Sequence, residues 1–545
     1  MKILLEFTTL NYRIWHSLAR RLKEVYPEAE FAGIMGIAPG GESAARFLKE
    51  QGDIRYEFIK FNHDIIAEAF KSRVDHEALK KFEESMPEKS LWRLIASDRN
   101  LGSSFMRGVL LDGTFINRNN SRENILKVVS GALSSYKKIF EGFRPDIFLP
   151  AIAMGSVSVH IFEYLCAEAG IPYIVPTSVR IKDIFAFASD VRLRFPAIDE
   201  TYRLYGEYGE GIYENYEAAR KLYDELMGEL EDPQYFDRKL PCFNVVKLKS
   251  PLEWCKFILS SVKSFGALVW SWKDHARLNL SGDVRRQTLS PRVMAHSMKN
   301  LFIRQIQRAR LRSPRFGEAP EKGLKYIYYP LHTSPEYSTQ FQGTMWMDQL
   351  HTIEMLAKSV PHDWVVCVKE HPAILAARVR PLDFYDRIKK FPNVTLAPID
   401  ADTHKMIAGA EMVAVVTGTS GWEAIQRGKP LICFSDNFWD VLGLSRKCCD
   451  AERLSSDIHE ESARLASIPE EERKSRIIRF LSAVIKHGFE LSYPQQFCYE
   501  KGTPEQYDLL GRQTADALIK HLKAVVNQGK TAKNAEKQLI GPECY

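Results

Sequence analysis

The chain has 545 residues, of which 45% are hydrophobic and 26% are charged, and its formal net charge is +6. These values are ordinary for a globular protein, and they exclude a wholly disordered chain, a collagen-like chain and a small disulfide-rich protein. At roughly 100 to 200 residues per domain, the length predicts two or three domains, and two large ones are the starting expectation.

Cysteine usage and the first residues indicate a protein of the cytoplasm. The nine cysteines are odd in number and irregularly spaced, which is typical of reduced intracellular thiols. None has zinc-ligand spacing, although Cys448 and Cys449 are adjacent. The start, MKILLEFTTL, has no small-residue cleavage site and reads as a buried strand rather than a signal peptide. Phe257–Trp272 is apolar but too short to span a membrane, and Lys263 interrupts it.

The first 235 residues alternate short apolar runs with helical patterns. Strands are expected at Lys2–Phe7, in EFAGIM, in RPDIFLP and in GIPYIVP, and helices at Tyr12–Val25, Ser121–Phe140 and Ser156–Ala169. Strands separated by helices predict right-handed crossovers and a mostly parallel sheet. Residues 1–235 are therefore predicted to form a Rossmann-like domain.

A second alternating block occupies residues 323–500. Its expected strands are KYIYYPL, WVVCVKEHP, NVTLAP, EMVAVVTGTS and KPLICF, with a helix at Trp346–Ser359. Gly428 and Pro430 mark the return from a helix to a strand. The fold class is therefore α/β, with two Rossmann-like doubly wound domains facing across a cleft. A C-terminal helix is expected over 501–528, followed by a flexible tail over 529–545.

The positive charge is concentrated between the two blocks, in a helical basic segment over residues 236–322. Residues 236–316 contain 17 Lys and Arg against four acidic residues. A solvated helical linker and a face for a membrane surface or an acidic acceptor are equally good interpretations. Nucleic acid is a weaker third one, since no nucleic-acid-binding signature accompanies the charge. Arg308, Arg310 and Arg312 are the residues that would contact a membrane.

Polar motifs follow several strands of the second block, where an α/β sheet binds ligands. Lys369–Pro372 closes one strand, and Thr417–Gly421 closes another and opens a helix whose free N–H groups could hold a phosphate. His332 and Glu336 follow the first strand of the block. Alternatively, Ser420 and Glu423 form only a capping box, and His371 only ends a strand.

These motifs, in the order YYPLHTSPEYST, DQLHTIEMLAKSVP, VVCVKEHP, FPNVTLAP and VVTGTSGWEAIQRGKPLICF, resemble the donor half of bacterial capsule and surface polysaccharide biosynthesis proteins. Such proteins are similar to GT-B-type glycosyltransferases related to Kdo transferases and bacterial sialyltransferases. The resemblance is strong over Lys325–Phe434. It is looser in the N-terminal half, where LWRLIASDR, FRPDIFLP and the GIP strand carry it.

The resemblance implies a nucleotide-sugar site with Glu423 on the ribose and the Lys-x-His-Pro and Thr-rich motifs on the phosphate. The implied donor-binding residues are His332, Glu336, Lys369, Glu370, His371, Thr417, Gly418, Thr419, Ser420 and Glu423. CMP is the favoured nucleotide, with UDP or GDP as alternatives because TGTS replaces the paired serines of sialyltransferases.

Catalytic groups are expected mainly from the N-terminal half, because a GT-B donor site faces the acceptor across the cleft. The candidates for the base are Asp98, which the loose resemblance favours, and Asp112, which is similar to an acidic-Gly motif of sialyltransferases; either could be a cap or a turn residue. His371 is the third catalytic candidate. Candidate acceptor-side residues are Arg99, Arg180 and Asp183, although an exposed ion pair explains the last two equally well.

Asp400 and Asp402 form an Asp-x-Asp pattern, which ligates a divalent metal in a different glycosyltransferase fold. Here Asp402 fits better as the N-cap of the helix that begins near Thr403. No metal or resident cofactor is expected. The sequence thus predicts a cytoplasmic glycosyltransferase that moves a sugar from a nucleotide-sugar donor to a capsular or lipopolysaccharide-type glycan, with peripheral contact to the inner membrane. A sugar-nucleotide epimerase or hydrolase and a non-catalytic polysaccharide-assembly factor are the alternatives.

Overall fold

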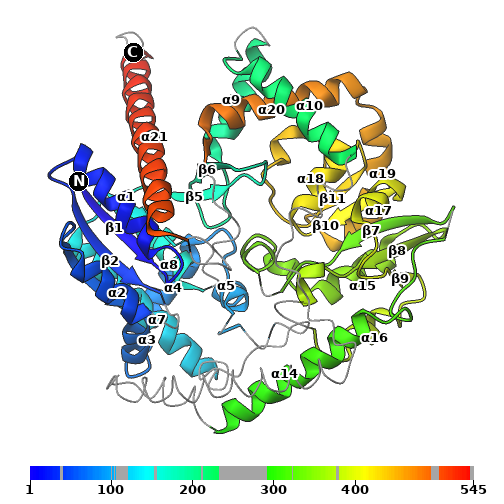
Figure 1. Ribbon diagram of the computed structural model, residues 1–545, viewed down its shortest axis with the longest axis horizontal. Coiled ribbons are helices and arrows are strands. Elements are labelled where there is room, and N and C mark those ends of the chain that lie inside the picture. The colour runs from blue at the N-terminus through cyan, green and yellow to red at the C-terminus, as the bar shows by residue number, and fades with distance from the viewer. Residues whose placement is uncertain are drawn as a thin grey trace, which may run out of the picture.

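The computed structural model describes residues 1–36, 41–99, 101–102, 105, 121–151, 156–209, 213–231, 291–321, 323–334, 336–375, 380–491 and 502–539. These residues form two α/β lobes, each built around its own parallel sheet, as the sequence predicts (Figure 1). We call them the N-terminal and the C-terminal lobe. Among the described helices, none combines the length and apolar character needed to cross a bilayer.

The N-terminal lobe contains a parallel sheet in the order β3-β2-β1-β4. Its strands are β1 (Lys2–Phe7), β2 (Glu30–Met35), β3 (Tyr56–Phe61) and β4 (Ile147–Leu149). Its helices are α1 (Tyr12–Val25), α2 (Gly41–Glu50), α3 (Asn62–Ala69), α4 (His76–Ser85), α5 (Leu91–Ser97), α7 (Arg122–Phe143) and α8 (Ser158–Ala169). The strand order changes direction between β1 and β4, which is where doubly wound sheets place ligands.

The predicted GIPYIVP strand belongs to this sheet only in part. Tyr173 forms a single parallel bridge to Phe148, after which the chain leaves the sheet. β5 (Val175–Ser178), β6 (Ile184–Ala188) and β13 (Phe489–Glu490) then form a separate antiparallel sheet. The proline-bounded strand is thus redirected toward the other lobe, and the helices α9 (Pro196–Tyr208) and α10 (Tyr216–Glu231) follow it.

The C-terminal lobe has a six-stranded parallel sheet in the order β12-β11-β10-β7-β8-β9. Its strands are β7 (Lys325–Pro330), β8 (Trp364–Lys369), β9 (Val394–Leu396), β10 (Met412–Val415), β11 (Leu431–Cys433) and β12 (Arg446–Lys447). Its helices are α14 (Pro291–Leu311), α15 (Gln349–Ser359), α16 (Phe384–Ile388), α17 (Thr403–Gly409), α18 (Thr419–Gln426) and α19 (Leu454–Ala466). When the six strands are numbered in chain order from β7, their order in the sheet is 6-5-4-1-2-3, which is the order of a Rossmann sheet. The switch point of this sheet lies between β7 and β10.

The last two helices of the chain pack on different parts of the molecule. Helix α20 (Glu470–His487) packs on α9 and α10, and α21 (Pro504–Leu539) packs on α1 (Figure 1). Helix α20 also contacts the C-terminal lobe, since Phe480 packs against Trp422 and Phe438. The sequence-based division, which gives residues 323–500 to one domain, stays a prediction. Helix α21 also continues to Leu539, beyond the expected end at 528.

The basic segment enters the described structure only from residue 291, and its earlier part lies outside the described residues. Helix α14 packs on the C-terminal lobe: Gln307 Nε2 donates to the Arg380 carbonyl (3.2 Å), and Arg310 forms an ion pair with Asp386. The last turns of α14 are therefore part of a lobe rather than a free linker. Arg310 has a structural partner, which leaves it less available to a membrane.

The packing of α21 on α1 gives a test of the fold. Leu518 is 0% exposed in the core of the N-terminal lobe, whereas Leu509, on the same helix, is 55% exposed. Leu518→Ala should lower the free energy of unfolding by about 2–4 kcal/mol because it removes buried methyl groups and leaves a cavity. Leu509→Ala should change it by less than about 0.5 kcal/mol. Equal effects in urea denaturation would contradict the docking of α21.

Candidate functional site

The loops that follow β7, β8 and β10 meet at the carboxyl edge of the C-terminal sheet. β7 pairs with β8 along its length and with β10 on its other side. The Leu331 N–H donates to the Lys369 carbonyl (2.8 Å), so the loops after β7 and β8 stay side by side. The three polar motifs predicted from the sequence are therefore brought to the switch point of the Rossmann sheet.

The loop after β10 leads into a helix start without a side-chain cap. Gly418 is the N-cap of α18 and has φ +107°, and within the described residues this helix start has no side-chain cap. The helix starts at Thr419, so Ser420 lies inside it, and the capping-box alternative is wrong. Uncapped N–H groups at the start of a helix, together with its dipole, favour an anion.

The backbone conformation at position 418 and the closeness of the His332 side chain both require a glycine there. A Cβ atom at this position would lie 3.2 Å from His332 Cε1, in addition to the strain of a positive φ. The imidazole of His332 therefore lies directly against the start of α18. Thr417, just before Gly418, is buried, while Thr419 is exposed at the mouth of the site.

Hydrogen bonds to its backbone hold His332 in place, and one of its ring nitrogens has no hydrogen-bond partner within the described residues. The Gln349 amide accepts from His332 N (2.7 Å) and donates to His332 O (3.0 Å). Within the described residues, His332 Nε2 is buried and has no hydrogen-bond partner. Burial, with the positive charges of His371, Arg180 and Arg380 nearby, lowers the pKa of His332 to about 3. The ring is therefore neutral at pH 7 and can donate one N–H to a ligand.

Lys369 ends β8 and is 3% exposed. Within the described part of the chain, its ammonium group has no hydrogen bond or ion pair, although Glu370, Asp400 and Asp402 are near enough to act on it electrostatically. Burial lowers the pKa of Lys369. A buried ammonium group without a direct partner is costly, and an anionic ligand would relieve that cost.

Glu370, predicted to touch the donor, is instead fully buried in a structural role. Its carboxylate accepts from Arg380 Nε (2.9 Å), from the Tyr385 hydroxyl (2.7 Å) and from His371 N (2.8 Å). Arg380 in turn donates to His332 O (2.6 Å). The sequence analysis missed Arg380 and Gln349, since neither belongs to a motif that follows a strand.

His371 is exposed as a whole residue, but its imidazole is partly surrounded by other groups of the site. Loss of hydration lowers its pKa, against the opposing charges of Glu336 and Glu370. Glu336 accepts from the Thr333 hydroxyl (2.8 Å) and lies near the Arg180 guanidinium, whose pKa burial lowers. These residues thus form one electrostatic group across the two lobes.

The predicted ribose ligand Glu423 lies one turn into α18, with its Oε2 atom 3.4 Å from His404 Nδ1. Burial lowers the pKa of His404 to about 4, so this imidazole is neutral at pH 7. Asp402 caps α17 by accepting from the N–H groups of His404 (2.9 Å) and Lys405 (3.2 Å), which confirms the cap interpretation. Among the described residues, no three His, Cys, Asp or Glu side chains gather as metal ligands.

The N-terminal candidates are dispersed. Asp98 is 2% exposed, and its two carboxylate oxygens accept from the N–H groups of Leu101 (2.8 Å) and Val157 (2.7 Å), so it ties α5 to the start of α8. Asp112 lies outside the described residues. Arg99 Nε donates to Gln340 of the other lobe (3.2 Å). Asp183 is exposed at a turn, and in the described structure it forms no ion pair with Arg180.

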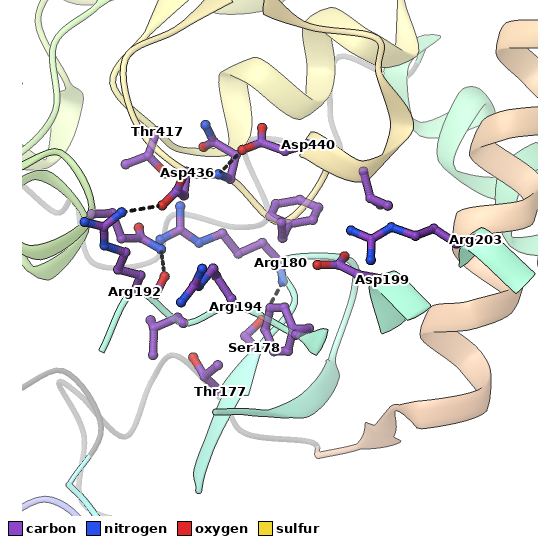
Figure 2. Close-up of a pocket in the computed structure, with 16 residues that line it drawn as sticks. Thr177, Ser178, Arg180, Arg192, Arg194, Asp199, Arg203, Thr417, Asp436 and Asp440 are labelled. Carbon is purple, nitrogen blue, oxygen red and sulfur yellow. Dashed lines mark hydrogen bonds and ion pairs between the residues drawn. The ribbon is translucent and has the colours of Figure 1, made fainter. Parts of the chain in front are cut away.

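A pocket of about 320 Å³ lies between the lobes next to the α18 loop (Figure 2). The C-terminal lobe contributes Gln342, Thr417, Asp436, Asn437, Phe438, Asp440 and Val441 to its lining. The N-terminal lobe contributes Thr177, Ser178, Arg180, Arg192, Leu193, Arg194, Phe195, Asp199 and Arg203. Arg180 has φ +59°, a conformation that is uncommon for a residue with a side chain and is often held at functional sites. Of the lining residues, the sequence analysis singled out only Arg180 and Thr417.

Comparison with known proteins agrees with the motif-based resemblance. The family described as Capsule polysaccharide biosynthesis protein matches residues 287–465. This segment resembles capsule polysaccharide biosynthesis proteins. The capsule-family segment runs from α14 to the end of α19, and it contains every residue predicted for the donor site. No curated protein matches the sequence.

Solved structures show only distant likeness to this chain. KpsC of Thermosulfurimonas dismutans, a beta Kdo 2,7 transferase, is 18% identical over 40% of this chain, with a TM-score of 0.23. The match spans 62% of that KpsC chain, less than two thirds of it. The UDP-GlcNAc 2-epimerase of Neisseria meningitidis is 11% identical over 95% of this chain and 100% of its own, with a TM-score of 0.21. The glycosyltransferase CalG4 is 13% identical over 89% and 94%, with a TM-score of 0.22. These likenesses are too distant to assign an activity.

The sequence analysis also missed Glu6, the one acidic residue of strand β1. Glu6 is 0% exposed, and its Oε2 atom accepts from Ala151 N (2.9 Å) at the switch point between β1 and β4. Its Oε1 atom has no hydrogen-bond partner among the described residues. Burial raises the pKa of Glu6 to about 7, so the site can hold either a proton or a charge near neutral pH.

This raised pKa predicts a pH-dependent stability. The protonated Glu6 stabilises the fold below about pH 4.5, and this contribution is lost as the pH rises through about 7. Glu6→Gln keeps a neutral acceptor for Ala151, so the variant should lose less stability than the wild type between pH 5.5 and 8, by up to roughly 2 kcal/mol. Thermal unfolding over this range measures the difference. The exposed Glu50→Gln is the control, and parallel curves for Glu6→Gln and the wild type would refute the assignment.

Proposed function

We propose that the protein is a glycosyltransferase that moves a sugar from a nucleotide-sugar donor to a growing capsular or lipopolysaccharide-type glycan. The observation that carries this proposal is the uncapped start of α18 at the switch point of the C-terminal sheet, beside His332. Lys369 lies at the same edge of the sheet, at the end of β8, which is two strands away from β10. The donor phosphate would bind there, and the N-terminal lobe would hold the acceptor across the pocket.

The positive charge of the site would stabilise the negative charge that develops on a departing nucleotide. When the bond from the anomeric carbon to the phosphate oxygen breaks, negative charge grows on that oxygen. Lys369, the dipole of α18 and the N–H of neutral His332 would stabilise that charge, and His371 would add a contact from the exposed side. Because these groups are fixed before the reaction, they cost little reorganisation. We propose that transfer needs no metal ion for this reason.

Glu423 and His404 support a nucleoside site beyond the phosphate. The Glu423 carboxylate lies one turn from the α18 start, at a suitable place to accept hydrogen bonds from ribose hydroxyls, and His404 would fix its orientation. The resemblance to Kdo transferases favours a CMP-sugar, with UDP- and GDP-sugars as alternatives. Glu370 would act only by positioning His332 and His371 through Arg380.

Membrane contact is proposed on α14. Phe302 and Ile306 lie one helical turn apart and are exposed on a helix rich in basic residues. This surface would bring a lipid-linked acceptor close to the enzyme. Since Arg310 already pairs with Asp386, the contact would depend on the apolar pair more than on that arginine.

The proposal is tested by ligand-observed NMR with CMP, UDP and GDP. We expect selective binding of one nucleotide and at least a tenfold loss of affinity in Lys369→Met, which removes the buried charge but keeps a side chain of similar length. The Tm of Lys369→Met should be unchanged or higher, because an unpaired buried ammonium group destabilises the fold. The exposed Lys405→Met should bind as the wild type does.

A structural role for Lys369 would give the opposite pattern, with a lowered Tm and unchanged nucleotide affinity. Sugar conjugates of the nucleotide that binds then separate the alternatives. Transfer to an acceptor glycan supports the proposal, whereas an epimerised sugar nucleotide formed without acceptor favours an epimerase. Absence of nucleotide binding by a folded protein would favour a non-catalytic assembly factor.

A further inference from the structure

The pocket between the lobes extends from Thr417, which precedes the proposed phosphate site, to a carboxyl group of the N-terminal lobe. Thr417, from the loop that starts α18, lines one part of the pocket, and Asp199, from the first turn of α9, lines another. In Figure 2, Thr417 and Asp199 lie on opposite sides of the pocket, with Arg180 between them. A sugar bound to the phosphate site would extend into this space.

Asp199 differs from the other acids that line the pocket. Asp436 forms ion pairs with Arg192 (2.9 Å) and Lys447, and Asp440 accepts from Asn437 N (2.9 Å). The carboxylate of half-buried Asp199 has neither a hydrogen bond nor an ion pair within the described residues. Asp199 is thus a pocket carboxyl that is open to a ligand.

The surroundings of Asp199 suit a group that exchanges a proton near neutral pH. Burial raises its pKa to about 6, while the positive charges of Arg203 and Arg194 oppose that shift. Asp440, which faces it from the C-terminal lobe, has a pKa raised to about 7 by burial. A carboxylate that is ionised at pH 7 and only weakly hydrated is a more effective base than one in bulk water.

We propose that Asp199 is the general base that takes the proton from the acceptor hydroxyl, an inference that rests on the proposed glycosyl transfer. The acceptor oxygen forms a bond to the anomeric carbon as its proton passes to the Asp199 carboxylate. The bond from the anomeric carbon to the phosphate breaks, and the nucleotide leaves with the electron pair. Asp98 is less suited to this step, since both of its oxygens are occupied by backbone N–H groups.

The test uses slow donor hydrolysis, in which water is the acceptor and needs the same base. Nucleotide release from CMP-Kdo, CMP-sialic acid, UDP-GlcNAc and GDP-mannose is followed for the full-length protein. For the donor that reacts, the wild-type rate should rise with pH through about 6. Asp199→Asn should lower the rate at least 100-fold and remove this dependence while leaving nucleotide affinity and Tm unchanged. The exposed neighbour Glu200→Gln should behave as the wild type.

A second variant distinguishes a base from a residue that only shapes the pocket. Azide attacks without losing a proton, so it should restore nucleotide release in Asp199→Ala and give a glycosyl azide. An active wild type with Asp199→Asn within threefold of its rate would overturn the assignment. So would loss of nucleotide affinity in Asp199→Asn, or an inactive Asp199→Ala that azide does not rescue. A wild type that binds no nucleotide and releases none from any donor overturns the proposed function itself.

Discussion

The geometry of the candidate site depends on the buried ion pair between Glu370 and Arg380. Both side chains are almost completely buried, and the pair is satisfied on each side, by Tyr385 and the His371 backbone and by the His332 carbonyl. A buried ion pair gains little net stability, but removing one partner leaves an uncompensated charge. The pair therefore fixes the loops after β7 and β8 together, and with them His371 and His332, the latter beside the start of α18.

Contacts between the lobes continue this framework. The Tyr337 hydroxyl donates to the Val191 carbonyl (2.6 Å), Gln342 donates to the Arg192 carbonyl (2.9 Å), and Arg192 forms an ion pair with Asp436. Helix α20 adds apolar packing that runs from one lobe into the other. These contacts place the arginine-rich segment after β6 opposite Thr417, so a ligand held by one lobe would meet polar groups of the other.

Much of this arrangement could be predicted from local patterns. Helix α1 has the predicted bounds, and the buried strands β7, β8 and β10 lie in the predicted runs, because apolar periodicity reports burial directly. The proximity of Lys369, His332 and Gly418 followed from the rule that parallel strands end at one edge. The roles of Glu370 and Asp199 could not be predicted, since they depend on Arg380 and on the packing of two lobes, which no local spacing encodes. The packing of α20 on α9 and α10, and of α21 on α1, could not be predicted for the same reason.

The central claim is that the start of α18 and Lys369 bind the phosphate of a nucleotide. Diffraction from crystals grown with CMP, UDP and GDP in turn tests it most directly. The account predicts phosphate density within hydrogen-bond distance of the Thr419 and Ser420 N–H groups, of the Lys369 ammonium group and of His332 Nε2. A nucleotide bound elsewhere, or a phosphate that contacts none of these groups, would contradict it.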